Sequence, residues 1–170
     1  MITKSTLNSC AAALAGAVAE STRSGLLRPG RADSTIGPDR TQPQREMSMP
    51  KTVSDLVNFA ASKAATEYYP TPAERLVKGR PEQHNTLHFE ADGRFFAGEW
   101  GAEPGCWRVS YSENEYFHIL SGRSILRDLD GNEMALAPGD KVCVPAGFEG
   151  EWEVLETTRK IYVIYENPAD

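Results

Sequence analysis

The 170-residue sequence has few histidines and cysteines and no long apolar run. No stretch approaches the roughly 20 apolar residues that a membrane-spanning helix needs, so we expect a cytoplasmic protein with no membrane partner. Only three histidines and three cysteines occur, and no Cys-x-x-Cys pair is present. Cys106 and Cys143 lie on predicted strands, where we expect reduced thiols in or near the core.

Several common phosphate-binding and catalytic motifs are also missing. No G-x-x-x-x-G-K phosphate loop occurs, and no local pattern indicates a Ser-His-Asp or Cys-His nucleophile. Acidic residues outnumber basic ones, 24 to 18, so the net charge is −6. A nucleic-acid partner is therefore not expected.

The first 48 residues differ from the rest of the chain. They contain no aromatic residue and carry six basic and four acidic residues, a net charge of +2. Residues 49–170 carry twelve basic and twenty acidic residues, a net charge of −8. Three interpretations of residues 1–48 are open: a disordered leader, a targeting segment, or translated upstream sequence before a start at Met47 or Met49.

Residues 49–74 are expected to form a short helix and a connector. In residues 52–66, Ser54 or Asp55 suits a helix N-cap, and a short apolar stripe follows. The Tyr-Tyr-Pro-Thr-Pro sequence of residues 68–72 ends this pattern. Residues 73–82 are mostly polar and continue the connector.

From residue 85 onward, short apolar stretches alternate with turns. Asp130-Gly131 between two such stretches is typical of a β-hairpin. Many short strands at this spacing predict an all-β sandwich or barrel. The predicted strands are residues 85–90, 94–100, 106–112, 115–121, 123–128, 132–136, 141–145, 150–156 and 159–166.

Two motifs resemble those of the cupin superfamily. Glu115-x6-Gly122 matches the end of the first cupin motif, and Gly139-x5-Pro145-x-Gly147 matches the start of the second. The resemblance implies an all-β double-stranded β-helix (jelly roll, RmlC-like) over residues 75–170, with a short N-terminal helix, and a homodimer. Within the superfamily, the chain is similar to the small single-domain cupins called (S)-ureidoglycine aminohydrolase-like.

That resemblance also gives a test for a metal site. Metal-binding cupins use three His and one Glu to hold Mn, Fe, Ni or Zn. Here Glu115 matches the Glu ligand, but the His-x-His positions fall on Arg108 and Ser110 (or on Val109 and Tyr111), and the last His falls on Gly150. We expect no tightly bound metal; a divalent metal held by Glu115 with other ligands, such as His88 and Glu113, is the alternative.

Alternation along the strands suggests which side chains face the interior. If Glu115 points inward, Phe117 and Ile119 do so too, while His118 points outward. An inward Arg108 is expected to pair with Glu115 or Glu113, whereas an outward Arg108 would reach the rim. The predicted ligand-binding residues are Arg108, Tyr111, Glu113 and Trp152, with Glu115 as the catalytic acid or base.

Two functions are compatible with these residues. The resemblance implies an enzyme acting on a small polar substrate, like the manganese cupins that release ammonia from (S)-ureidoglycine. The missing ligands favour a non-catalytic cupin that binds a small molecule and has lost its metal site. Replacing Glu115 by Ala separates the two, because turnover is lost in the first case and only affinity changes in the second.

Overall fold

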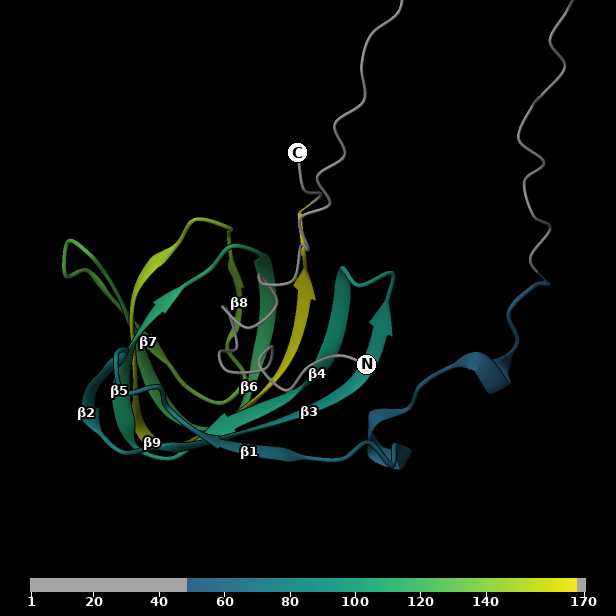
Figure 1. The fold of residues 1–170 in the computed structure, drawn as a ribbon, viewed down its shortest axis with the longest axis horizontal. Helices are drawn as coiled ribbons and strands as arrows, with labels where there is room; N and C mark the ends of the chain where they lie inside the picture. The colour runs from purple at the N-terminus through teal and green to yellow at the C-terminus, as the bar shows by residue number, and fades with distance from the viewer. Residues whose placement is uncertain (1–48, 168–170) are drawn as a thin grey trace, which may run out of the picture. The chain divides into compact units, whose positions relative to one another are not determined.

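The computed structural model describes residues 49–167. Residues 49–56 and 57–167 belong to different compact units. The first contains one 3-10 turn, η1 (Val53–Asp55), and the second begins with another, η2 (Phe59–Ala61). Nine strands follow (Figure 1): β1 (Glu67–Pro70), β2 (Leu76–Gly79), β3 (Glu82–Ala91), β4 (Phe95–Ala102), β5 (Gly105–Ser110), β6 (Asn114–Asp128), β7 (Glu133–Leu136), β8 (Lys141–Val144) and β9 (Glu149–Tyr165). No helix in residues 49–167 is long and apolar enough to cross a membrane.

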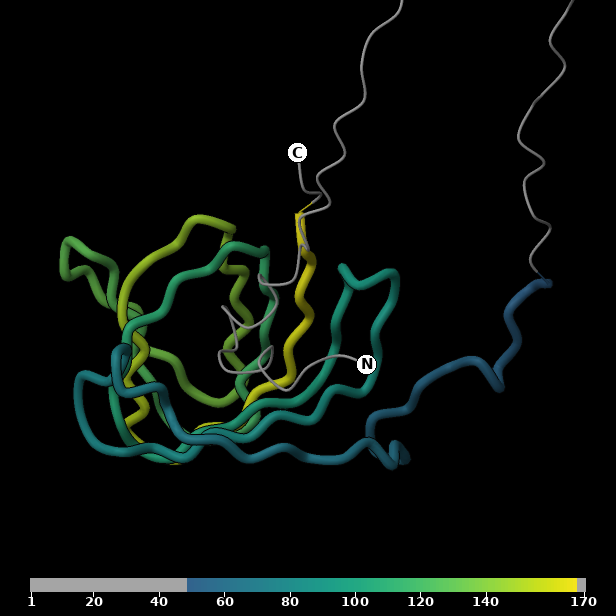
Figure 2. Tube along the Cα trace, in the orientation of Figure 1, coloured from purple at the N-terminus to yellow at the C-terminus, as the bar shows by residue number. Residues whose placement is uncertain are grey.

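Two long strands organise the fold. β6 and β9 pair antiparallel along their lengths, from Asn114 opposite Tyr165 to Asp128 opposite Gly150. The first part of β6 pairs with β8 on its other side, and its last part pairs with β7. β9 pairs with β4 near its end and with β5 near its start, so the sheet curls into an open barrel (Figure 2). This confirms the predicted all-β jelly roll.

Buried and exposed residues alternate along the strands, and the buried side chains form the core. Along β9 the buried positions recur at every second residue in both halves of the strand. Because successive side chains of a strand point to opposite faces, one face of β9 lines the interior. The interior cluster is aromatic and aliphatic, and includes Trp100, Trp107, Phe117, Trp152 and Tyr162.

The predicted helix over residues 52–66 is wrong. The segment forms only η1 and η2, each of three residues. The side chain of Asn58 accepts a hydrogen bond from the Ala60 backbone N–H, and Ser62 does the same for Ala64. Such local bonds compete with a continuing helix. Val53 and Leu56 are exposed, so no packing supports an α-helix there.

The strand boundaries also differ from the expectation. β1 and β2 lie in segments expected to be a connector, and they pair with β3 and β5 at the edges of the sheet. The stretches expected as two strands around Gly122 form the single strand β6, and those around residue 157 form β9. Bulges at residues 119–124 let these strands bend without ending. The open interpretations of residues 1–48 lie outside the described residues.

Candidate functional site

A buried ion pair occupies the barrel interior beside the first motif. Lys160 Nζ lies 2.6 Å from Glu115 Oε1, and the two side chains are 1% and 0% exposed. Glu115 comes from β6 and Lys160 from β9. A charge this deeply buried is tolerated only when it is paired and hydrogen-bonded, so each of these residues depends on the other.

Three aromatic rings surround the Lys160 ammonium group. Nζ lies 4.5 Å from the ring centroid of Trp152, 4.6 Å from that of Phe117 and 5.1 Å from that of Trp100. The rings also contact one another, with Trp152 5.5 Å from Trp100 and 5.4 Å from Phe117. Cation–π attraction therefore adds to the ion pair in stabilising a charged lysine inside the core.

Opposing effects act on the pKa of the Glu115 carboxyl group. Burial raises its pKa, whereas the Lys160 charge and hydrogen bonds with Lys160 and Tyr111 lower it; the net pKa is raised. The second carboxyl oxygen, Oε2, is buried without a hydrogen-bond partner among the described residues, as is Trp152 Nε1. One free acceptor and one free donor thus remain beside the ion pair.

Glu113 is a second buried carboxyl group at the same end of the barrel. It is 2% exposed, and its Oε2 accepts a hydrogen bond from Ser112 Oγ at 2.9 Å. Its pKa is raised to about 7, chiefly by burial and in smaller part by the neighbouring Glu166 and Glu115, against hydrogen bonds from Ser112 and from its own backbone N–H that lower it. A carboxyl group that titrates near neutrality is able to take or give a proton.

The structure brings together four of the five residues predicted from the sequence. Tyr111, Glu113, Glu115 and Trp152 are all buried in the barrel. Arg108 is exposed on β5, between the buried Trp107 and Val109. Of the two alternatives left open for Arg108, the structure therefore has the outward one: alternation along β5 turns the arginine away from the interior, and Lys160 is the partner of Glu115.

The site residues do not fit a transition metal. Glu115 Oε1 already accepts the Lys160 ammonium, and a second positive charge at that oxygen would be repelled. The other motif positions supply Arg108 and Ser110, both exposed, and Gly150, which has no ligating side chain. His88 stacks on Phe59 at 4.4 Å. In residues 49–167, no three His, Cys, Asp or Glu side chains are placed to hold an ion.

A cavity of about 280 Å³ lies beside the buried site. Its walls include Leu126, Val144 and Phe148. Val144 is opposite Glu115 in the β6–β8 pair, and Leu126 is opposite Trp152 in the β6–β9 pair. Glu115, Lys160 and Trp152 do not themselves line this cavity, which is of a size to hold a small molecule.

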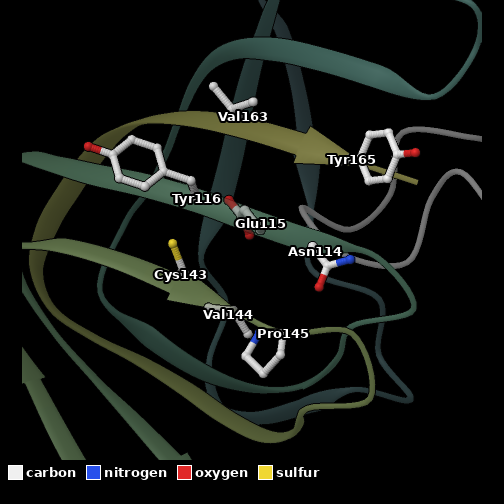
Figure 3. Close-up of a pocket in the computed structure, with 8 residues that line it drawn as sticks. All are labelled: Asn114, Glu115, Tyr116, Cys143, Val144, Pro145, Val163 and Tyr165. Atoms are coloured by element: carbon white, nitrogen blue, oxygen red, sulfur yellow. The ribbon is translucent and has the colours of Figure 1, made fainter. Parts of the chain in front are cut away.

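A second hollow, of about 400 Å³, lies where β6, β8 and β9 run side by side (Figure 3). Tyr116 pairs across the strands with Cys143 and with Val163, so these three side chains share one face. They alternate with Glu115, Val144 and Ile164, which face the interior. The lining of this hollow thus combines side chains of the outer face of the sheet with Glu115 and Val144.

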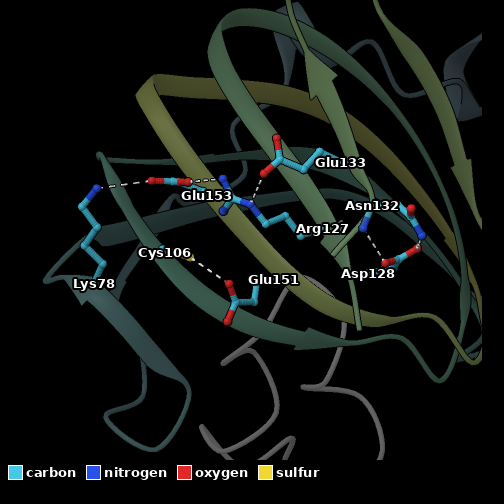
Figure 4. A network of polar contacts seen from close by, with 8 residues as sticks. All are labelled: Lys78, Cys106, Arg127, Asp128, Asn132, Glu133, Glu151 and Glu153. Carbon is cyan, nitrogen blue, oxygen red and sulfur yellow. Dashed lines mark hydrogen bonds and ion pairs between the residues drawn. The ribbon is translucent and has the colours of Figure 1, made fainter. Parts of the chain in front are cut away.

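The acidic residues Glu149, Glu151 and Glu153 alternate with the buried positions of β9, as expected for an outward face. Glu153 lies 2.7 Å from Arg127 and 3.4 Å from Lys78, and these contacts lower its pKa (Figure 4). Part of the acidic face is therefore neutralised by an ion-pair network that joins β2, β6 and β9. Exposed pairs of this kind each stabilise a protein by about 1 kcal/mol or less.

Lys160 is the functional residue that the sequence analysis missed. Alternation along the last strand could have identified it. Every second position from residue 158 to residue 164 lies on one face, and this face ends with the apolar residues Tyr162 and Ile164. This pattern places a lysine on the inward face of β9. Phe117 was expected to face the interior, but only the position of Lys160 shows that Phe117 and Trp100 lie beside a cation.

Comparisons with known proteins agree with this architecture. Residues 89–162 match the model of the EutQ-like cupin domain. A protein of unknown function from Pseudomonas syringae, of the DUF861 family, is 21% identical, with a TM-score of 0.54 over 60% of this chain and 45% of that one. The Clostridium difficile EutQ protein is 21% identical, with a TM-score of 0.46 over 53% of this chain and 65% of that one.

A DUF861 protein from Thermotoga maritima is 34% identical, with a TM-score of 0.37 over 38% of this chain and 73% of that one. No curated protein matches the chain. The chain spans less than two thirds of the length of the Pseudomonas and Clostridium structures. At 21% identity the Pseudomonas structure supports the fold alone.

Proposed function

We propose that the cupin domain, whose residues 89–162 match the model of the EutQ-like cupin domain, binds a small polar molecule without a transition metal. One observation carries the proposal: the Lys160 ammonium pairs with Glu115, the one residue that matches a cupin metal ligand. A lysine ammonium is a compact positive group with three N–H donors, so it orients a carboxylate as a metal would, but it provides no open coordination position.

Two buried polar atoms support a ligand beside this pair. Glu115 Oε2 accepts and Trp152 Nε1 donates, and neither has a partner among the described residues. Buried groups of this kind are normally satisfied, because leaving one unpaired costs about 1–3 kcal/mol. A ligand group that both donates and accepts, such as an amide, a hydroxyl or a protonated amine next to an oxygen, would satisfy both.

Thermal unfolding with small polar compounds, in the presence of a chelator, tests this function. We expect compounds that raise the unfolding temperature of the full chain without any added metal. The Glu115→Gln variant should lose at least about tenfold in affinity, because a charge-assisted hydrogen bond contributes about 1.5–3 kcal/mol. The matched variant Glu149→Gln, at an exposed carboxylate, should bind as the unchanged chain does. Binding that requires Mn, Fe, Ni or Zn would contradict the proposal.

The second candidate is an enzyme of the aminohydrolase type that uses acid–base chemistry. The pKa of about 7 at Glu113 favours it, since proton transfer is most efficient when the pKa is near the working pH. Release of ammonia from amine- or amide-bearing compounds that is abolished in Glu115→Ala would favour the enzyme. A homodimer, expected from the cupin resemblance, remains a prediction.

A further inference from the structure

The outer face of the sheet around the second hollow is apolar and exposed (Figure 3). Two adjacent rows of outward side chains run across β4, β9, β6 and β8 there. One row includes Phe95 and Tyr165, and the next includes Val163, Tyr116 and Cys143; we call these five residues the apolar face. The three aromatic residues are 37–46% exposed, and Cys143 is also exposed. Aromatic residues gathered on one exposed face are typical of a protein interface.

The apolar face is uncharged, although the folded part of the chain is acidic. None of its five side chains carries a charge, whereas residues 49–170 have a net charge of −8. Farther along β4 and β9, Glu99 and Arg159 pair with each other at 3.0 Å. At the border of the face, Arg94 donates a hydrogen bond to the Tyr165 hydroxyl at 2.8 Å. Since like-charged molecules repel, an acidic chain meets a second copy of itself most easily through an uncharged, apolar surface such as this one.

A second exposed apolar surface lies in the segment that precedes β1. Val53 and Leu56 are 83% and 72% exposed, and Val57 is 44% exposed. We call residues 53–57 the apolar arm. Large apolar side chains gain free energy only when another apolar surface removes them from water. A single copy of the chain therefore presents both an exposed apolar arm and an exposed apolar face.

The residues that follow the arm are fixed to their own sheet. The Phe59 ring stacks on His88 of β3, with ring centroids 4.4 Å apart. Thr66 Oγ1 and Thr86 Oγ1 form a hydrogen bond of 2.8 Å, and β1 then pairs with β3. An exchange between two copies therefore involves only the residues before Phe59.

The dimensions of the arm suit those of the face. Four strands spaced about 4.8 Å apart, with two rows of side chains about 7 Å apart, give the face an area of about 270 Å². A stable interface takes about 800 Å² from each partner, so two such faces in contact are too small by themselves. Five extended residues are about 17 Å long, close to the width of about 19 Å of the four strands. An arm laid across the face adds the missing area.

We infer that the chain forms a two-fold dimer in which the apolar arm of each copy lies across the apolar face of the other. The arm's side chains fill the hollow of about 400 Å³, whose lining includes Tyr116, Val163 and Tyr165. The exchange buries the exposed apolar surfaces of both copies, and its two-fold symmetry closes the assembly at two chains. This assembly goes beyond the proposed function and does not depend on a ligand.

Size-exclusion chromatography with light scattering tests the inference on the full chain. At about 100 μM we expect twice the mass of one chain. Tyr116→Lys in the face and Leu56→Asp in the arm should each raise the Kd of the dimer at least about tenfold, because each places an unpaired charge in a buried apolar contact. Leu155→Lys and Leu129→Asp are the matched controls, since these exposed leucines lie outside both surfaces; they should leave the Kd unchanged.

An equimolar mixture of the two weakened variants distinguishes exchange from other arrangements. In a mixed dimer, the intact arm of the Tyr116→Lys chain meets the intact face of the Leu56→Asp chain. In the other contact, the new aspartate meets the new lysine, and opposite charges attract. We therefore expect the mixture to dimerise more tightly than either variant alone. A folding defect gives no such rescue, and thermal unfolding of each variant checks that it is folded.

Three results would overturn the inference. A full chain that is monomeric at this concentration leaves the apolar face to another occupant, such as residues 1–48. A dimer that tolerates both Tyr116→Lys and Leu56→Asp uses a different surface. A mixture that dimerises no better than its components shows that the arms are not exchanged. Each of these results leaves the proposed ligand binding untouched, because thermal unfolding with small polar compounds measures that binding separately.

Discussion

Replacing Lys160 by Met is expected to lower the free energy of unfolding by about 3–5 kcal/mol. The methionine fills a similar volume but leaves Glu115 buried without its partner, among Trp100, Phe117 and Trp152. An unpaired charge in such surroundings is strongly destabilising, and the carboxyl group would take up a proton instead. Urea unfolding at pH 8 measures the loss.

The pH dependence and a double variant show whether the charge is responsible. Protonation of the orphaned Glu115 should make the loss smaller at pH 5 than at pH 8. In the double variant Lys160→Met with Glu115→Gln, no charge remains buried, so much of the stability should return. As a matched control, Arg159→Met breaks the exposed pair with Glu99 and should cost about 1 kcal/mol or less. Equal losses for Lys160→Met and Arg159→Met would show that the buried pair has no special role.

Gly122→Ala is expected to be nearly as damaging, for reasons of geometry. Gly122 has φ of +82°, a conformation that costs a residue with a Cβ about 1–2 kcal/mol. An added Cβ would also collide with the carbonyl oxygen of Thr157 and lie 2.6 Å from the Cα of Thr158, both in the backbone of β9. Forcing the two strands apart adds about 1–3 kcal/mol, so we expect a total loss of about 2–5 kcal/mol in urea unfolding.

Gly131→Ala provides the matched control. Gly131 has a similar φ of +85°, but nothing lies within 4 Å of an added Cβ. Its loss should be limited to the conformational cost of about 1–2 kcal/mol. If the two alanine variants were equally stable, the close approach of β9 at Gly122 would not constrain the bend of β6.

The β-barrel could be predicted because the turns and motif spacings that indicate it lie within short stretches of the sequence. Turns at Asp130-Gly131 and Gly139, and the spacing from Glu115 to Gly122, follow from backbone geometry that the sequence displays directly. Gly122 was read as the end of a strand, because glycine usually marks a turn. In the structure, β6 continues past Gly122 because it pairs with β9 on both sides of that residue. Pairing with a strand that is distant in the sequence cannot be recognised from the residues around Gly122.

The candidate site was less predictable, since its residues come from distant strands. The cupin match placed Glu115 at a ligand position in the interior, and alternation then placed Phe117 and Ile119 on the same inward face, where the structure has them. Neither identified the partner of Glu115, because 45 residues separate it from Lys160 and a lysine is normally expected in solvent. Arg108 was a reasonable alternative on charge alone, but its neighbours Trp107 and Val109 occupy the inward positions of β5.

The central claim is that Lys160 takes the place of a metal beside Glu115, and metal analysis tests it most directly. The full chain, purified without a chelator or a His-tag, is analysed by mass spectrometry for Mn, Fe, Ni and Zn. We predict less than about a tenth of an equivalent of any of them. About one equivalent of a single metal, lost in Glu115→Ala, would contradict the claim and show that Glu115 is a metal ligand.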